Sequence, residues 1–129
     1  MRLITGIDLV EIERLREASE RWGARFLQRI FTADELACSG GRPESLAARW
    51  AAKEATAKAL GLGLCGLGAP AGAIPWRSVE IVKGERGEPL LRLSDVAATR
   101  AAELGITTFS ISLTHSGGFA AAVVVGIAM

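Results

Sequence analysis

An alanine-rich segment without internal glycine or proline runs from Glu44 to Leu60, and it predicts one long helix. Gly61 and Gly63 follow directly, as is typical of the C-terminal end of a helix. Residues 61–75 hold five glycines and two prolines, and they predict a long flexible loop. Loops of this kind are more often functional or disordered than structural.

Strand and helix patterns alternate along the rest of the chain. Before the long helix we expect a strand at Leu3–Leu9, a helical region at Val10–Ile30 that Gly23 divides, and a short helix at Ala33–Cys38. After the loop we expect strands at Trp76–Val82 and Pro89–Leu93, a helix that Ser94 and Asp95 cap and that runs to Leu104, and a hairpin of strands at Ile106–Leu113 and Phe119–Ile127. This order predicts an α+β fold, a single compact domain over residues 1–129 with a mixed or antiparallel sheet and the long alanine-rich helix.

Composition bounds the class of protein. The chain has 129 residues, of which 50% are hydrophobic and 22% charged, as in soluble globular proteins. The net charge of +1 gives no indication of a nucleic-acid partner. No signal peptide is evident, and the most apolar stretch, Phe119–Met129, is shorter than the about 20 residues of a membrane span. Cys38 and Cys65 lack companions at metal-ligand spacing, so we expect free thiols in a cytoplasmic protein without a membrane partner.

Trp50, Glu54 and Lys58 form one stripe of the long helix, at positions i, i+4 and i+8. Glu54 and Lys58 are either a solvated ion pair, contributing about 0.3 kcal/mol, or part of a functional site. The tryptophan in the same stripe and the glycine-rich loop after the helix favour a site, because backbone amides in such loops can approach phosphates.

Asp8 lies where the first strand is expected to meet the first helix. Its carboxylate is either a helix N-cap or a ligand of a bound cation. Mg²⁺ takes one or two protein carboxylates and completes its six ligands with water and substrate phosphate. Asp8 and Glu54 together would supply that number, although spacing alone does not show that they meet.

His115 is the only histidine of the chain. It lies at the end of an expected strand, beside hydroxyl residues and before Gly117 and Gly118. It is either an ordinary surface or structural residue or part of a site at this junction, where functional residues often gather.

Basic residues recur along the first helical region. Arg14, Arg21 and Arg25, at i, i+7 and i+11, project within about 40° of one another on a continuous helix. They form either a solvated face balanced by neighbouring glutamates or a docking strip for an acidic partner.

Taken together, these segments resemble the short holo-[acyl-carrier-protein] synthases, the small trimeric class of 4′-phosphopantetheinyl transferases. Three motifs match in order: Gly6–Ile12, Arg49–Ala55 with Lys58, and Ser110–Ser116. Arg29–Thr32 with Glu35 and Gly87–Pro89 are weaker matches. Two positions depart from the family pattern, since Gly61-Leu62-Gly63 stands for Gly-Thr-Gly and Trp50 for phenylalanine.

The resemblance implies an enzyme that transfers the 4′-phosphopantetheine group from coenzyme A to a serine of an apo acyl carrier protein. It implies that Asp8 and Glu54 hold Mg²⁺ against the pyrophosphate and that Lys58 stabilises the leaving 3′,5′-ADP. Nucleotide binding is implied for Arg49, the loop at Gly61 and Gly63, His115 and Ser116. Carrier binding is implied for Arg14, Arg21 and Arg25, and the site is expected between the subunits of a homotrimer.

The serine must also lose a proton as it attacks. Glu54, a metal-activated water and Glu35 are the candidate acceptors. Two alternatives to an enzyme remain: a relative that binds coenzyme A or the carrier without transfer, and a structural protein in which Asp8 caps a helix. The carrier belongs to fatty-acid, polyketide or peptide synthesis, and these are not distinguished by the sequence.

Overall fold

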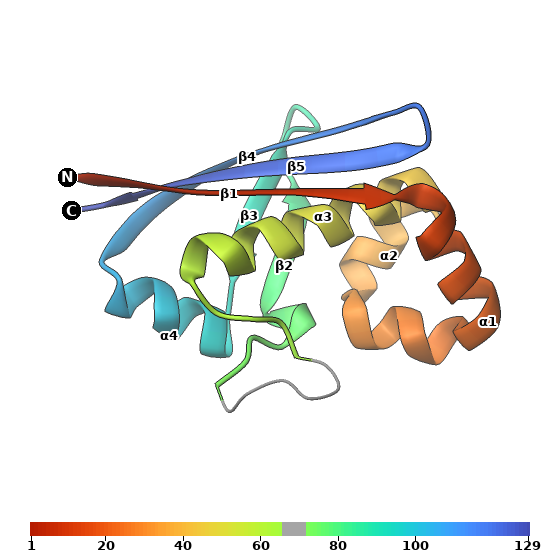
Figure 1. Cartoon of the computed structure of the whole chain (residues 1–129), viewed down its shortest axis with the longest axis horizontal. Coiled ribbons are helices and arrows are strands. Elements are labelled where there is room, and N and C mark those ends of the chain that lie inside the picture. The colour runs from red at the N-terminus through yellow and green to blue at the C-terminus, as the bar shows by residue number, and fades with distance from the viewer. Residues whose placement is uncertain (66–71) are drawn as a thin grey trace.

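The alanine-rich helix lies against one face of a three-stranded antiparallel sheet in the computed structural model, which describes residues 1–65 and 72–129 (Figure 1). The helix is α3, Pro43–Leu60, and the sheet has the order β1-β5-β4. Its strands are β1 (Arg2–Glu11), β5 (Phe119–Ala128) and β4 (Ile106–Ser116). Alanines fill most of the contact, because small side chains let a helix lie close to a sheet; Ala51, Ala52, Ala55, Ala59 and Ala122 are all buried there.

A tight hairpin joins β4 and β5. Ser116 pairs with Phe119, and the two residues between them, Gly117 and Gly118, have φ angles of 58° and 85°. A two-residue turn with both angles positive matches the twist of the strands, and glycine adopts it without strain. The expected hairpin is confirmed, and both strands extend further than the sequence pattern predicted.

Helices α1 (Ile12–Ile30) and α2 (Ala33–Ser39) cover one end of α3, at the right of Figure 1. Gly23 has φ 69° and ψ −155°, so α1 is two helical segments joined at a kink, as expected. Leu15, Ile30 and Phe31 form a core there with Leu46 of α3. The capping box at Thr32 and Glu35 begins α2.

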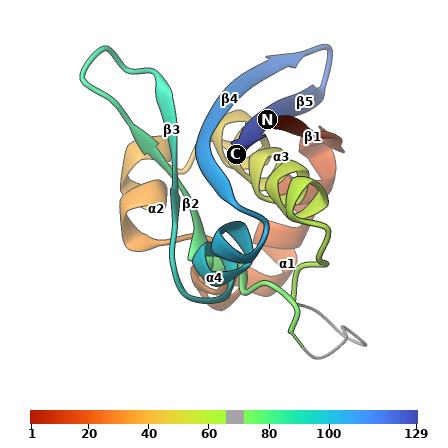
Figure 2. The ribbon, with the colours of Figure 1, turned by 90° about the vertical axis from the view of Figure 1, so that its left-hand side faces the viewer.

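A second antiparallel pair, β2 (Val79–Lys83) and β3 (Pro89–Leu93), extends away from the body of the molecule (Figure 2). Helix α4 (Asp95–Glu103) follows it. The expected strand at Trp76–Val82 is partly wrong, because Trp76–Ser78 form a 3-10 helix, η1. The hydroxyl of Ser78 donates to the carbonyl of Pro75, 2.7 Å away, and closes that turn.

The predicted α+β class with antiparallel sheets is confirmed. The predicted loop after α3 is closed at its base, where Leu64 bridges Ile74 and the backbone N–H of Cys65 donates to Ile74 at 2.8 Å. The central part of that predicted loop, residues 66–71, lies outside the described residues. Within residues 1–65 and 72–129, every helix is too short or too polar to span a membrane.

Candidate functional site

Strand β1 approaches α3 very closely at Gly6. A Cβ atom at this position would overlap the carbonyl oxygen of Ala55 and lie 3.1 Å from the backbone nitrogen of Ala59. Side chains alternate along a strand, so Asp8 points to the same face as Gly6 and towards the helix. The close approach therefore places the Asp8 carboxylate beside the stripe of α3 that holds the half-buried Glu54 and the exposed Lys58.

Asp8 is not a helix cap. It lies within β1, where it is paired with Ala122, and the N-cap of α1 is Glu11. The Lys58 ammonium lies 3.1 Å from Asp8 Oδ1 and donates a second hydrogen bond to the carbonyl of Ile7 at 2.9 Å. The expected stripe of α3 thus meets β1 through Lys58, and the pairing partner of Lys58 is Asp8 and not Glu54.

Asp8 and Glu54 line one pocket of about 590 Å³ between β1, α1 and α3. Its other walls combine apolar side chains, among them Leu15, Phe26 and Trp50, with the charged Glu11 and Arg14. Trp50 contacts Phe26 on one side and Trp76 on the other, with ring centroids 5.9 and 4.5 Å apart. The two carboxylates therefore face a pocket with both polar and apolar walls.

Glu54 is half-buried, and burial raises the pKa of its carboxyl; the nearby charge of Asp8 raises this pKa further, while Lys58 opposes the rise. A bound cation would relieve this repulsion. No cluster of three or more His, Cys, Asp or Glu side chains suited to a metal occurs among the described residues. Two carboxylates in an open pocket fit Mg²⁺, which usually keeps water and substrate phosphate among its ligands.

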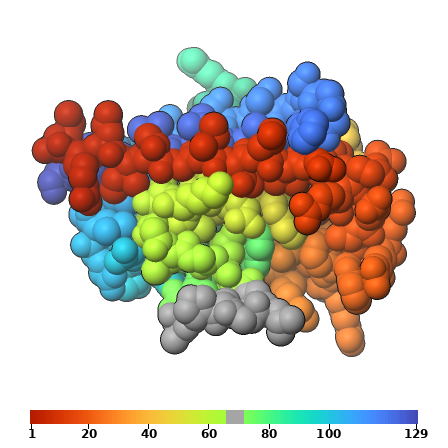
Figure 3. All heavy atoms as spheres, viewed as in Figure 1, coloured from red at the N-terminus to blue at the C-terminus, as the bar shows by residue number. Residues whose placement is uncertain are grey.

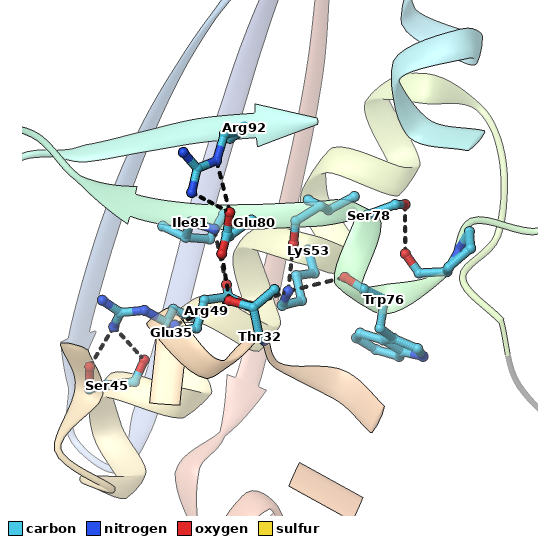
Figure 4. Close-up of polar contacts among 12 residues, drawn as sticks. Thr32, Glu35, Ser45, Arg49, Lys53, Trp76, Ser78, Glu80, Ile81 and Arg92 are labelled. Carbon is cyan, nitrogen blue, oxygen red and sulfur yellow. Dashed lines mark hydrogen bonds and ion pairs between the residues drawn. The ribbon is translucent and has the colours of Figure 1, made fainter. Parts of the chain in front are cut away.

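Glu35, one of the expected proton acceptors, does not line this pocket. Its side chain is fully buried and faces Lys53, whose ammonium lies 2.7 Å from Glu35 Oε1 (Figure 4). The other carboxylate oxygen accepts the N–H of Ile81 at 3.0 Å. Burial lowers the pKa of Lys53, and the charge of Glu35 opposes this shift. Glu35 therefore ties α2 to α3 and β2.

Arg49 lies away from the carboxylates, in a second pocket of about 290 Å³. This pocket lies between α3, the β2–β3 pair and β4, and Lys83 and Ser112 also line it. The Arg49 side chain is 5% exposed. Its Nη1 donates to the Ser45 side chain (Figure 4), and its buried Nε has no partner among the described residues.

The other expected nucleotide residues are dispersed. Gly61, with φ 72°, caps the C-terminus of α3 near Arg100. The carbonyl of Gly63 accepts from Ile74 N–H at 2.8 Å. His115 and Ser116 are exposed at the end of β4, and β5 separates them from β1. One chain therefore does not bring these residues together with Asp8 and Glu54.

The basic residues of α1 are exposed, but they do not form one continuous strip. Arg14 lines the pocket of the carboxylates, and the Arg21 guanidinium lies 4.9 Å from the ring centroid of Trp22. The expected alignment assumed a continuous helix from Arg14 to Arg25. The kink at Gly23 breaks that phase, so the alignment holds for Arg14 and Arg21 only.

Two functional features were not predicted. The role of Gly6 as a contact with Ala55 was missed, although a glycine two residues before a candidate ligand was a signal for close approach. The aromatic wall of the first pocket was also missed, since Phe26, Trp50 and Phe119 are far apart in the sequence.

Residues 4–124 match the model of the 4′-phosphopantetheinyl transferase superfamily. The chain therefore belongs to this superfamily. It is 54% identical over 125 residues to the holo-[acyl-carrier-protein] synthase of Herpetosiphon aurantiacus, covering 97% of this chain and 98% of the relative. The synthase of Chloroflexus aurantiacus is 52% identical over 132 residues, covering 95% of this chain and 96% of that protein.

Solved structures of the same kind share the fold. The Helicobacter pylori holo-[acyl-carrier-protein] synthase in complex with coenzyme A has a TM-score of 0.81 and 31% identity, over 96% of this chain and all of that one. The Chronobacterium ammoniagenes synthase–coenzyme A complex has a TM-score of 0.83 and 28% identity, over 100% of this chain and 99% of that one.

Proposed function

We propose that this chain transfers the 4′-phosphopantetheine group of coenzyme A to a serine of an apo acyl carrier protein, with Mg²⁺ held by Asp8 and Glu54. The observation that carries the proposal is that Asp8 and Glu54 line one pocket and that Asp8 also pairs with Lys58, in a chain similar over nearly its full length to holo-[acyl-carrier-protein] synthases. Neither a relative without transfer activity nor a structural protein requires all three of these residues to lie together.

The donor set fits a hard cation. Asp8 and Glu54 offer carboxylate oxygens in an open pocket, with room for the phosphates of the substrate. When bound, Mg²⁺ supplies positive charge to the pyrophosphate of coenzyme A.

In the reaction the serine oxygen forms a bond to the phosphorus that bears pantetheine, and the bond from this phosphorus to the bridging oxygen breaks. Negative charge develops on the departing 3′,5′-ADP. The Lys58 side chain is 57% exposed, so its ammonium can move from Asp8 to this oxygen and stabilise the charge. Of the two glutamates considered as proton acceptors, only Glu54 lines the pocket.

The nucleotide half of the site is proposed to come from a neighbouring subunit of a homotrimer. Arg49, whose buried Nε has no partner among the described residues, and Lys83 line a basic surface separate from the carboxylate pocket, and the exposed His115 lies further along β4. A phosphate-bearing ligand would join the two surfaces if they faced each other across an interface. Gly61 and Gly63 stay proposed contacts beside Lys58.

An exposed apolar sheet face supports this assembly. Leu3, Ile7 and Leu9 of β1 are 63%, 67% and 63% exposed, and Val123 of β5 is 37% exposed. These side chains point away from α3, and Figure 3 shows β1 as a band across the surface. Contiguous apolar faces of this kind mark protein interfaces.

Carrier docking is proposed for Arg14 and Arg21, with Arg25 beyond the kink making a separate contact. Arg14 lies at the rim of the pocket, so an acidic partner bound there would bring its serine towards Asp8 and Glu54. We place the reaction in the cytoplasm, supported by Cys38 and Cys65, which are both unpaired.

The deciding experiment is mass spectrometry of an apo carrier protein incubated with the chain, coenzyme A and Mg²⁺. We expect the carrier to gain the mass of phosphopantetheine. Asp8→Asn should abolish this gain, with Glu11→Gln at the same pocket as the matched control. If carriers from fatty-acid, polyketide and peptide synthesis all stay unmodified, the proposed transferase activity is refuted.

A further inference from the structure

We propose that Gly6 is a positioning residue, which sets the separation between the Asp8 and Glu54 carboxylates by letting β1 lie directly on the backbone of α3. The inference rests on the proposed metal site and goes beyond it. Gly6 contacts neither substrate nor metal, and it acts through the strand that carries Asp8.

The contact at Gly6 is between backbones. An added Cβ would overlap the Ala55 carbonyl oxygen and approach the Ala59 nitrogen to 3.1 Å, and both atoms belong to the rigid interior of α3. A side chain could rotate away from such a clash, but the backbone of a buried helix cannot. The strand would therefore have to move away from the helix.

Asp8 would move with the strand. Gly6 and Asp8 pair with Val124 and Ala122 of β5, so β1 is held in register over this stretch and shifts as a unit. Glu54 belongs to α3, one residue before Ala55, and would remain in place. Displacement of β1 thus widens the gap between the two carboxylates. It also pulls Asp8 and the Ile7 carbonyl away from the Lys58 ammonium, which now lies 3.1 and 2.9 Å from them.

The proposed cation is sensitive to such a shift. Mg²⁺ requires near-octahedral geometry, with oxygen ligands at about 2.0–2.1 Å. A displacement of a few tenths of an ångström is larger than this tolerance allows without loss of a ligand. The metal site therefore requires a residue without a Cβ at position 6, in addition to any requirement of packing.

Gly126 provides a matched control. It lies on the same face of the same sheet, where it pairs with Ile4 of β1, and it is buried. A Cβ there would meet the side chains of Ile106 and Phe109 at 3.2–3.3 Å, which can shift. Gly126→Ala thus crowds the core beneath the sheet without separating Asp8 from Glu54.

The test measures binding of Mn²⁺, as a paramagnetic probe for the Mg²⁺ site, to the chain with saturating coenzyme A and no carrier. Electron paramagnetic resonance reports the free ion. We expect Gly6→Ala to weaken Mn²⁺ binding by about 10- to 100-fold, the range found when residues that orient metal ligands are changed. Gly126→Ala should bind Mn²⁺ as the wild type does, whatever its melting temperature. Equal affinities for Gly6→Ala and the wild type would overturn the proposal.

Two further variants keep the test decisive. If the wild type binds no Mn²⁺, or Asp8→Asn binds it equally well, the metal site itself is wrong, and not the role of Gly6. Asp8→Glu answers the case in which Gly6→Ala does not fold. With the strand fixed, the longer side chain overshoots, so affinity should fall by at least about 10-fold; an unchanged affinity would show that the separation is not fixed. If the double variant Gly6→Ala with Asp8→Glu folds, it should bind Mn²⁺ more tightly than Gly6→Ala alone, because the longer side chain spans the wider gap.

Discussion

The ammonium of Lys58 lies 3.1 Å from Oδ1 of Asp8, and this contact ties the helix that carries Glu54 to the strand that carries Asp8. Asp8 is 18% exposed and Lys58 is 57% exposed, so the pair lies at the pocket edge and not in the core. An ion pair this exposed contributes little to stability. We therefore expect Lys58 to matter for the transfer reaction and not for stability.

Replacing Lys58 by methionine should slow transfer. The variant keeps the length of the side chain but removes the cation that stabilises the departing 3′,5′-ADP, and loss of one such group typically lowers kcat by about 10²–10³. Single-turnover kinetics with saturating carrier measure this step. The melting temperature should change little. Transfer at the wild-type rate would show that Lys58 does not contact the leaving group.

Protonation of Glu54 should govern the pH dependence of both stability and cation binding. Its pKa in the folded chain is raised above the ordinary value of 4.5, so the folded state holds this proton more tightly than the unfolded state. Without metal, the free energy of unfolding should therefore fall as pH rises from 4.5 through the folded pKa. Cation affinity should rise over the same window, because the ionised carboxylate is the ligand.

Glu54→Gln tests this directly. The variant should lose the fall in stability with pH, resist urea better than the wild type at pH 7, and have no transfer activity. Glu85→Gln, in the turn between β2 and β3, is the control for loss of a negative charge. Identical pH profiles of unfolding for Glu54→Gln and the wild type would contradict the assigned shift.

Charge reversal on α1 should separate carrier binding from coenzyme binding. Arg14→Glu at the pocket rim should raise the KM for the carrier and reduce its dependence on salt, while the KM for coenzyme A stays constant. Arg16→Glu is the matched control, since Arg16 lies two residues away and pairs with Glu13 at 3.5 Å. Equal effects of the two reversals would mean that only the net charge of the helix matters.

A charge on the outer face of the sheet should disrupt the assembly. Ile7 is 67% exposed and points away from α3, so Ile7→Glu should leave the fold intact but place a carboxylate in the proposed interface. Sedimentation should show a trimer for the wild type and a monomer for the variant, with transfer lost in parallel. A wild-type chain that is monomeric at assay concentration would rule out a site shared between subunits.

The elements of the fold were largely predictable because local signals define them. The uninterrupted alanine-rich run predicted α3, and the capping pattern at Thr32 and Glu35 predicted the start of α2. The error at Trp76–Ser78 has a tertiary cause, since Trp76 packs on Trp50 and its ring N–H donates to the Cys65 carbonyl at 2.8 Å. Such contacts override the apolar pattern that predicts a strand.

The roles of the candidate site residues stay predictions, and their arrangement could not be predicted from the sequence. The motifs named Asp8, Glu54 and Lys58, yet only the contact of Gly6 with Ala55 shows how a strand residue reaches a helix stripe. The burial of Glu35 could not be predicted either, because it depends on a distant contact. A capping residue is expected to be near solvent, and its burial follows from Lys53, a partner 18 residues away.

The buried pair of Glu35 and Lys53 should dominate stability without taking part in transfer. Lys53 also donates to the carbonyls of Trp76 and Val79. Lys53→Met leaves the Glu35 charge buried without its cation, and breaking such a pair costs about 3–5 kcal/mol. Urea unfolding should show this loss, whereas the exposed Arg77→Met should change stability by at most about 0.5 kcal/mol. Folded Lys53→Met should still bind Mn²⁺ in the presence of coenzyme A.

A double variant tests whether the pair can be replaced. Because Glu35 also accepts backbone N–H groups from Thr32 and Ile81, Glu35→Leu with Lys53→Met should not restore wild-type stability. Full recovery would show that the pair is dispensable.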